Sequence, residues 1–252
     1  MNDPFRLDGR VALVTGANTG LGQAMAVALA NAGAHIVALG RSEPTQTRQL
    51  VEEAGHKLAW VESELSPVSL LPAAVDAARA CFGRLDILLN NAGTIRRAPA
   101  IEVTEDDWDA VSEINLKSTF FLTQAVAKRW LADGTRGKVI NIVSMLSFQG
   151  GVRVASYTAS KSGLLGITRL LCNEWAAAGI HVNAIAPGYF ATRNTQQLHD
   201  DPVRHQAILD RIPAGRWGQP EQLGGAVVYL ASPASDYVNG AVLPVDGGWL
   251  AR

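Results

Sequence analysis

Short runs of apolar residues, many of them β-branched, recur along the whole chain and limit most strongly how it can fold. Most of these runs are apolar at every position, whereas a strand with one face in water alternates apolar and polar residues. Strands that are apolar on both faces are typical of parallel sheets covered on both sides. The predicted strands span residues 11–14, 35–39, 58–61, 85–89, 138–143, 181–185 and 241–245.

The segments between these runs mostly predict helices, as in the Ala-rich stretch 23–32 that ends before Gly33. Strands that alternate with helices build α/β folds with a parallel sheet. We therefore expect an α/β, Rossmann-type, doubly wound parallel sheet of about seven strands with helices on both faces. Ligands of such folds bind in the crevice beyond the carboxyl ends of the strands.

With 252 residues, 48% of them hydrophobic, the chain can bury a full core, and we expect one domain over residues 1–252. The stretch 191–217 differs from the rest: it is polar, contains Pro202 and Pro213, and interrupts the rhythm of strand and helix. It predicts a mobile substrate lid; an ordinary surface insertion would look the same.

The charge balance argues against nucleic acid and anionic membranes as partners, because 22 Lys and Arg face 23 Asp and Glu. Residues 11–40 carry none of these four residue types, yet glycines and polar residues interrupt them as they would not in a membrane helix. Cys81 and Cys172 lie far apart in helix-like segments. We expect two buried, reduced thiols and a cytoplasmic protein.

A glycine-rich turn follows the first predicted strand and leads directly into a helix. Gly16, Gly20 and Gly22 let backbone amides approach a ligand closely, and the helix N-terminus favours a pyrophosphate. The spacing is GxxxGxG, and no Lys-Ser or Lys-Thr follows, which argues against a nucleotide triphosphatase. A tight turn that binds nothing is the alternative.

Tyr157 and Lys161 are spaced by four residues in a helical segment, so both side chains emerge on one face. A neighbouring ammonium lowers the pKa of a phenol from about 10 and suits it to acid–base work. Ser144 ends the strand 138–143, and its hydroxyl is expected to face the crevice and bind a substrate carbonyl. Asn90 and Asn115 add amides that we expect to be buried, either as structural hydrogen-bonding groups or as part of the site.

These motifs together resemble the short-chain dehydrogenase/reductase family over essentially the whole chain. The motifs are TGANTGLG at 15–22, NNAG at 90–93, Asn115, Ser144, YTASK at 157–161 and IAPG at 185–188. The resemblance implies a nicotinamide dinucleotide cofactor, hydride transfer to or from a secondary alcohol or ketone carbon, and a homotetramer. It implies no metal site.

The resemblance also implies the role of each residue. Tyr157 is the general acid and base, Lys161 binds the nicotinamide ribose and lowers the tyrosine pKa, Ser144 orients the carbonyl, and Asn115 supports a proton-relay water. Thr192 touches the cofactor carboxamide or phosphates. The expected cofactor-binding residues are Gly16, Asn18, Thr19, Gly20, Leu21, Gly22, Gly40, Arg41, Glu64, Leu65, Asn91, Ala92, Gly93, Tyr157, Lys161, Pro187, Gly188 and Thr192.

A narrower resemblance, to sugar-acid dehydrogenases of uronate and pectin catabolism, covers residues 95–100, 144–161, 185–198, 210–223 and the C-terminus. It implies 2-dehydro-3-deoxy-D-gluconate as the substrate, with C5 as the reacting carbon. An arginine matches a carboxylate bidentately, so we expect Arg96, Arg153 or Arg193 to bind the acid group, with Ser144 and Gln149 also at the substrate.

The cofactor preference is read at the end of the second strand, where an acidic residue would bind the ribose 2′-OH. This chain has Gly40 and Arg41 there, which admit a 2′-phosphate and favour NADP over NAD. Glu43 could still bind the 2′-OH, so NAD stays open. Glu64 stands where the family usually has Asp near the adenine, and we expect an effect on affinity.

Two other functions fit the same sequence. One is a reductase of the same family acting on 3-oxoacyl thioesters or on another polyol or ketone, because one fold serves many substrates through its loops. The other is a non-catalytic NAD(P)-binding regulator. The intact set of Ser144, Tyr157 and Lys161 argues against the regulator.

Overall fold

The computed structural model describes residues 3–252, and within them one parallel sheet has the strand order β3-β2-β1-β4-β5-β6-β7. Neighbouring strands pair in register from Val11 opposite His35 to Pro187 opposite Val245. The strands are β1 (Val11–Thr15), β2 (His35–Gly40), β3 (Leu58–Glu62), β4 (Ile87–Asn90), β5 (Gly137–Ile142), β6 (Ile180–Pro187) and β7 (Val242–Val245). The predicted fold class is confirmed, and six of the seven predicted strands begin within one residue of the observed start.

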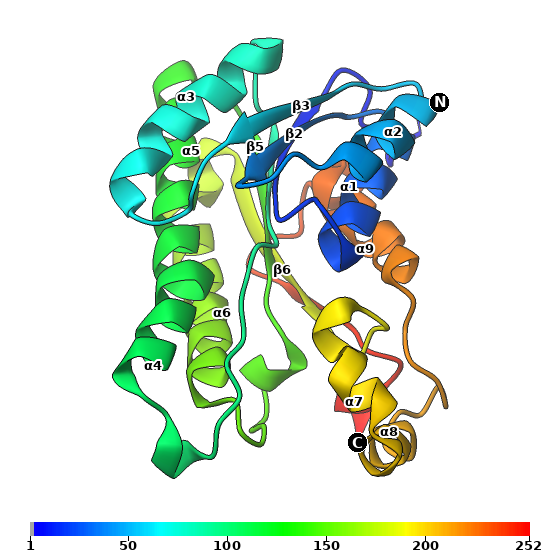
Figure 1. Ribbon diagram of the computed structural model, residues 1–252. Helices are drawn as coiled ribbons and strands as arrows, with labels where there is room; N and C mark the ends of the chain where they lie inside the picture. The colour runs from blue at the N-terminus through cyan, green and yellow to red at the C-terminus, as the bar shows by residue number, and fades with distance from the viewer. Residues whose placement is uncertain (1–2) are drawn as a thin grey trace.

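Helices cover both faces of the sheet (Figure 1). One face carries α1 (Gly20–Asn31), α2 (Thr45–Glu53) and α9 (Gly224–Ala231). The other carries α3 (Leu71–Phe82), α5 (Thr119–Asp133) and α6 (Ala155–Trp175), with α4 (Glu105–Ser112) and the π-helix η3 (Glu113–Ser118) leading into α5. Short 3-10 turns are η1 (Val68–Leu70), η2 (Ala100–Glu102), η4 (Met145–Ser147), η5 (Ala176–Ala178), η6 (Arg193–Thr195), η7 (Pro220–Leu223), η8 (Pro233–Ser235) and η9 (Trp249–Ala251).

The apolar runs in the middle of the sheet fold as strands because they bury both of their faces, whereas the edge strands β3 and β7 are only partly buried. In β1, Ala12 and Val14 pack toward α1 and α9, whereas Val11 and Leu13 pack toward α3 and α5. All of β1 and all of β6 are buried. Burial of a large aliphatic side chain contributes about 1.5–3 kcal/mol, so the two apolar layers supply much of the stability.

The expectation of two buried thiols needs correction. Both cysteines are free thiols, but Cys81 on α3 is exposed and Cys172 on α6 is only partly buried. The prediction that both are buried was wrong. Among residues 3–252 no helix is long and apolar enough to cross a membrane.

The segment 191–217 is more ordered than its polar sequence suggests. It holds η6, α7 (Gln196–Asp200) and α8 (Pro202–Leu209), and the Asp201 carboxylate caps the first turn of α8. Ile208, Ile212 and Trp217 bury their side chains in a cluster with Met145 and Trp249. The two helices form a lobe beside the carboxyl ends of the strands (Figure 1).

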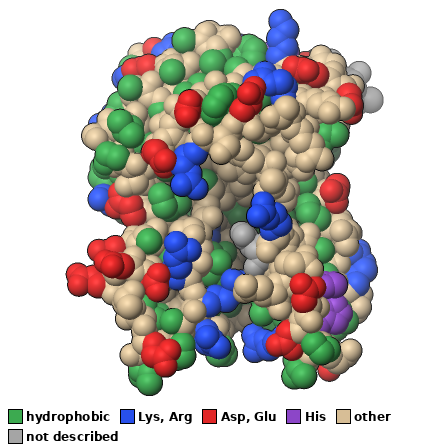
Figure 2. Space-filling view, in the orientation of Figure 1, with side chains coloured by type: hydrophobic (Ala, Val, Ile, Leu, Met, Phe, Trp, Pro, Cys, Tyr) green, Lys and Arg blue, Asp and Glu red, His purple; other side chains and the backbone are tan. Residues whose placement is uncertain are grey.

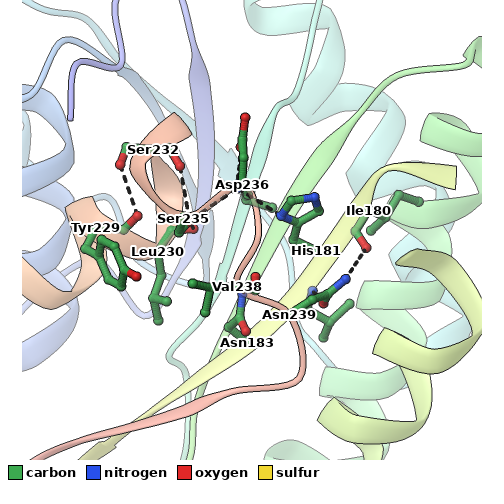
Figure 3. Close-up of polar contacts among 12 residues, drawn as sticks. Ile180, His181, Asn183, Tyr229, Leu230, Ser232, Ser235, Asp236, Val238 and Asn239 are labelled. Atoms are coloured by element: carbon green, nitrogen blue, oxygen red, sulfur yellow. Dashed lines mark hydrogen bonds and ion pairs between the residues drawn. The ribbon is translucent and has the colours of Figure 1, made fainter. Parts of the chain in front are cut away.

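At the opposite edge of the sheet, a buried imidazole lies beside a lysine. Lys138 on β5 donates to Nδ1 of His181 on β6 at 3.0 Å and to Asp236 at 2.8 Å. Figure 3 shows His181, Asp236 and Ser235 turned toward this point, and Ser235 accepts from Lys138 at 3.2 Å. Burial and the charge of Lys138 both lower the pKa of His181, against the opposing charge of Asp236.

Acid should therefore destabilise the fold through His181. Its pKa in the folded protein lies below the ordinary value of 6.5, so folding favours the neutral ring. The stabilisation is present above pH ~6.5 and is lost as the pH falls below it. We expect His181→Asn, which keeps an acceptor for Lys138, to lose less unfolding free energy than the parent between pH ~7.5 and ~5, by on the order of 1 kcal/mol. Urea unfolding at both pH values measures this, and an equal loss in the two proteins would contradict it.

Candidate active site

The carboxyl ends of the central strands meet at one edge of the sheet. The order places β1 beside β4, so the chain leaves these two neighbours toward opposite faces and opens a crevice between them. Thr15 ends β1, Asn90 ends β4, Ile142 ends β5 and Pro187 ends β6. The predicted site residues follow these four strand ends or the ends of β2 and β3, except for Asn115 in η3 and Tyr157 and Lys161 on α6.

The glycine turn after β1 is packed too closely to hold side chains. Gly16 and Gly20 have positive φ angles of 66° and 58°, which favour glycine. A Cβ on Gly22 would overlap the Gly16 carbonyl and the Asn91 amide. The backbone at the N-terminus of α1 is therefore open to a ligand, which is what a pyrophosphate site needs.

Hydrogen bonds from the loop after β4 fix this turn. The Asn91 side chain donates to the carbonyls of Thr15 and Gly16, each at 3.1 Å. The hydroxyl of Thr15 accepts from the backbone N–H groups of Asn91 and Ala92, each at 3.0 Å. Thr15 is buried and was missed in the sequence, although its place at the end of the first strand could have identified it.

The remaining predicted residues of the turn lie where expected. Thr19 is the N-cap residue of α1, without a side-chain capping bond, and Leu21 packs on the apolar layer beneath the helix. Thr192, in the loop after β6, lies beside the turn, since a Cβ on Gly20 would be 3.7 Å from its methyl group. Gly188 is bonded to β7 through the Val245 carbonyl at 3.0 Å.

The residues after β2 include an acid, Glu43, that is held in a short ion pair, and a mostly exposed cation, Arg41. Glu43 is ion-paired with Arg48 at 2.8 Å, and Arg48 also donates to the Leu58 carbonyl. Arg41 is largely exposed and lies 3.9 Å from Glu64. Asn18 spans the crevice and donates to the Ser42 carbonyl at 2.7 Å, while Leu65 packs on the apolar layer below α3 and α5.

Tyr157, Ser144 and Lys161 come together beside the glycine turn. The Tyr157 phenol is hydrogen-bonded to Ser144, whose Oγ also accepts from the Leu146 N–H at 3.1 Å. Lys161, one turn further along α6, is buried and donates to the Ile142 carbonyl at 2.6 Å. Its ammonium lies 5.8 Å from the centre of the Tyr157 ring.

Burial shifts the two titrating groups of this set in opposite directions. It lowers the pKa of Lys161 to about 8, and it raises the pKa of Tyr157 above its ordinary value of 10. The bond to Ser144 and the charge of Arg97 oppose the shift of Tyr157 without reversing it. The expected lowering of the tyrosine pKa by Lys161 is therefore not met, because desolvation of the phenol outweighs the nearby charges. The phenol is protonated at neutral pH and can donate a proton.

Asn115 lies in the π-helix η3, fully buried, and clamps the loop after β4. Its amide accepts from the Thr94 N–H at 2.8 Å and donates to the Thr94 carbonyl at 2.9 Å. Gly93 lies against this clamp, since a Cβ there would be 3.1 Å from Asn115 Oδ1 and 3.7 Å from Lys161 Nζ. Asn115 thus joins the Gly93 loop to the helix of Tyr157 and Lys161.

The four loop arginines have different surroundings. Arg96 is ion-paired with Asp107 on α4 at 3.4 Å, and Arg153 and Arg193 are exposed. Arg97 is exposed too, and its charge partly opposes the burial that raises the pKa of Tyr157 and of Tyr189. The sequence could not separate the neighbours Arg96 and Arg97, because the loop conformation decides which of the two charges acts on these tyrosines.

Gln149, expected at the substrate, joins two sides of the site entrance. Its Oε1 accepts from Arg211 at 2.8 Å, and Arg211 also stacks on Trp249, with its guanidinium carbon 4.1 Å from the ring. Figure 2 shows a hollow between the lobe of α7 and α8 and the lobe opposite, with Lys and Arg side chains at its rim. Within residues 3–252, no three His, Cys, Asp or Glu side chains gather as metal ligands would.

Comparison with known proteins places this geometry among dehydrogenases. Residues 16–250 match the family model described as enoyl-(acyl carrier protein) reductase. The chain is 58% identical over 248 residues to 2-dehydro-3-deoxy-D-gluconate 5-dehydrogenase of Escherichia coli K12, covering 98% of each protein.

Two crystal structures share the fold over nearly the whole chain. A protein of Agrobacterium tumefaciens with bound NADP is 56% identical, with a TM-score of 0.94 and full coverage of both chains. A gluconate 5-dehydrogenase of Burkholderia cenocepacia, in complex with NADP and tartrate, is 42% identical, with a TM-score of 0.95 over 99% of this chain and 98% of that one.

A substitution in the glycine turn tests whether this turn binds the dinucleotide. We expect Gly22→Ala to lower dinucleotide affinity at least about tenfold and to destabilise the fold by ~1–3 kcal/mol, because the new methyl group displaces the Gly16 carbonyl and the Asn91 amide. Calorimetric titration with NADP and urea unfolding measure the two effects. Gly225→Ala in α9, where a Cβ meets nothing within 4 Å, is the control and should bind NADP as the parent does. Parent-like affinity in Gly22→Ala would contradict the assignment.

Proposed function

Because the chain belongs to the short-chain dehydrogenase/reductase family, we propose that it is an NADP-linked dehydrogenase that interconverts 2-dehydro-3-deoxy-D-gluconate and its 5-keto counterpart. The observation that carries the proposal is the set of Tyr157, Ser144 and Lys161 beside a glycine turn, in a chain 58% identical to an enzyme of that name. The exposed arginines around the entrance, Arg97 among them, suit a substrate with a carboxylate.

The glycine turn fits a dinucleotide, because side chains at Gly16 and Gly22 would disturb its tight packing on Asn91, and the turn leads into the N-terminus of α1, whose backbone N–H groups favour a pyrophosphate. When bound, the nicotinamide supplies or accepts the hydride. Glu43 is held by Arg48, which leaves Arg41 as the charged group available to a 2′-phosphate. This pairing and the NADP bound in both neighbouring crystal structures support NADP as the preferred cofactor.

Tyr157 moves the proton in the proposed reaction. In the reductive direction its protonated phenol donates to the forming alkoxide, and in the oxidative direction the phenolate accepts the alcohol proton. Ser144 is bonded to the same phenol and is placed to donate to the substrate oxygen. The two hydroxyls thus fix the carbonyl of the substrate at Tyr157.

Lys161 holds a positive charge close to the phenol in a site that water reaches poorly. Its bond to the Ile142 carbonyl fixes the ammonium at the end of β5, next to Ser144 in the chain. There it can bind the ribose hydroxyls of the cofactor and stabilise phenolate when the proton leaves. Asn115 keeps the loop of Gly93 against Lys161 and so preserves the room for a relay water.

We assign the substrate carboxylate to Arg97 ahead of Arg96, Arg153 and Arg193. Of these four arginines, Arg97 is the one whose charge acts on both Tyr157 and Tyr189. A guanidinium binds a carboxylate through two parallel hydrogen bonds, which would orient the sugar acid with C5 at Tyr157. The segment 191–217 serves as the lid over this substrate, with Arg211 and Gln149 as its contact across the entrance.

The active form in this proposal is a cytoplasmic homotetramer of single-domain subunits. Apolar side chains exposed on α5 and α6, namely Phe121, Leu131 and Leu170, support an interface on that face. The edge strand β7, with Val242 and Leu243 only half-buried, supports a second one. Two free thiols agree with a reducing compartment.

The proton transfer gives a direct test of the function. Tyr157→Phe should lower kcat for oxidation of 2-dehydro-3-deoxy-D-gluconate by about 100- to 10,000-fold, because no group replaces the phenolic oxygen that accepts the alcohol proton. Absorbance of the reduced nicotinamide follows the rate. NADP affinity, measured by calorimetry, should stay within about threefold of the parent's because the aromatic ring remains. Near-parent turnover in this variant would refute the mechanism.

The carboxylate assignment is tested by two neighbouring residues. Arg97→Gln should raise KM for the sugar acid by about 10- to 100-fold, since a charge-assisted bond of ~1.5–3 kcal/mol is lost. Arg96→Gln removes the same charge from the same loop but only an exposed ion pair, and KM should stay within about twofold. If Arg96→Gln has the larger effect on KM, the assignment to Arg97 is wrong.

A further inference from the structure

Four polar side chains are buried together in the apolar layer that separates the sheet from α5 and α6. Asn90 ends β4, and Asn141 lies opposite it in register on β5. Thr123 on α5 and Thr168 on α6 lie above them, and all four are at most 4% exposed. Around them the layer is built of aliphatic and aromatic residues such as Leu122 and Leu171.

These side chains form one continuous hydrogen-bonded chain from helix to helix. The Asn90 amide donates to Thr123 Oγ1 and to Asn141 Oδ1, each at 2.8 Å. The Asn141 amide donates to Thr168 Oγ1 at 3.0 Å. Both hydroxyls then donate to backbone carbonyls of their own helices, at Thr119 and Leu164. Each strand amide is therefore tied to the helix above it.

This chain of bonds lies directly beneath the reacting residues. Thr168, Leu164, Lys161 and Tyr157 recur at helical spacing along one side of α6, so a rotation of the helix that moves Thr168 moves the other three. Thr168 follows Lys161 by seven residues, or about 10 Å along the helix axis. On the strand side, Asn141 directly precedes Ile142, whose carbonyl accepts from Lys161.

An apolar layer alone would leave the position of α6 along and about its axis weakly determined. Aliphatic contacts are non-directional and change little when a helix slides or rotates by a fraction of a turn. A hydrogen bond between buried groups has one geometry, and breaking it leaves an unsatisfied amide in a dry environment. The bond from Asn141 to Thr168 therefore selects one position of α6 on β5.

We propose that Asn141 and Thr168 are positioning residues that hold α6 in register with β5 and thereby set Tyr157 and Lys161 against Ser144 and the Ile142 carbonyl. Asn90 and Thr123 make the same kind of connection between the sheet and α5, which follows the π-helix of Asn115. The proposal rests on the proposed function only where it uses a change in kcat as evidence. The positions of Tyr157 and Lys161 are also measurable without substrate.

The test compares three single variants of α6. Thr168→Val keeps the shape of the side chain and removes the hydroxyl, and Thr168→Ser keeps the hydroxyl. Leu171→Val trims a buried residue on the same helix that has only apolar packing to lose. Thr168→Val should lower kcat by about tenfold or more and shift the pH profile of kcat by about half a unit or more, because the tyrosine–lysine pair sets that profile. Thr168→Ser should restore most of both, and Leu171→Val should keep both near the parent's.

A second measurement separates this proposal from the proposed function. Phenolate absorbance, taken as the difference between each protein and its Tyr157→Phe counterpart, titrates Tyr157 without substrate. The midpoint should shift in Thr168→Val by about half a unit or more and stay at the parent's value in Leu171→Val. If the parent lacks turnover but this shift occurs, the proposed function fails and the positioning role stands.

A double variant covers the case in which Thr168→Val does not fold. Asn141→Leu with Thr168→Val removes the Asn141 amide that Thr168→Val alone would leave unsatisfied. Asn90 loses one acceptor but keeps its bond to Thr123, so much of the stability should recover. The proposal expects kcat and the Tyr157 midpoint to stay altered in this double variant. Parent-like kcat and midpoint in either Thr168→Val or the double variant would overturn it, as would equal effects of Thr168→Val and Leu171→Val at matched stability.

Discussion

The rest of the structure depends on the adjacency of β1 and β4 in a fully buried parallel sheet. Both strands end at the same edge, and their chains leave toward opposite faces, which opens the crevice. Asn91 and Thr15 join the two strand ends through four hydrogen bonds, and these bonds shape the glycine turn. A buried sheet thus supplies a rigid edge on which loops of special conformation can be held.

Desolvation of the buried site shifts the pKa of both Tyr157 and Lys161. The same dry surroundings that lower the pKa of Lys161 to about 8 raise that of Tyr157, because burial disfavours the charged form of each group. Ser144 and Arg97 moderate the shift of the tyrosine. Burial also makes the positions of Tyr157 and Lys161 important, because water does not screen their interaction, which then depends steeply on distance. In our proposal, the hydrogen bonds of Asn141 and Thr168 under α6 fix these positions.

Much of this arrangement was predictable from the residues. Strands buried on both faces leave continuous apolar runs, and a glycine turn, a serine at a strand end and a Tyr–Lys pair at helical spacing are local patterns. Features that depend on tertiary packing were not predictable. The effect of the Arg97 charge on Tyr157, the exposure of Cys81, the pKa direction of Tyr157 and the helices of the segment 191–217 follow from contacts between distant segments. The sheet-buried Asn141 reads as one polar residue in an apolar run until its partner on α6 is known.

The central claim is that this site transfers a hydride between a nicotinamide and C5 of a sugar acid. The most direct measurement is the appearance of reduced nicotinamide absorbance with purified protein and 2-dehydro-3-deoxy-D-gluconate, run in parallel with NADP and NAD. The account predicts turnover with this substrate, faster with NADP because Arg41 is available and Glu43 is engaged by Arg48. No reduction of either cofactor, by a protein that binds NADP, would contradict the assigned substrate.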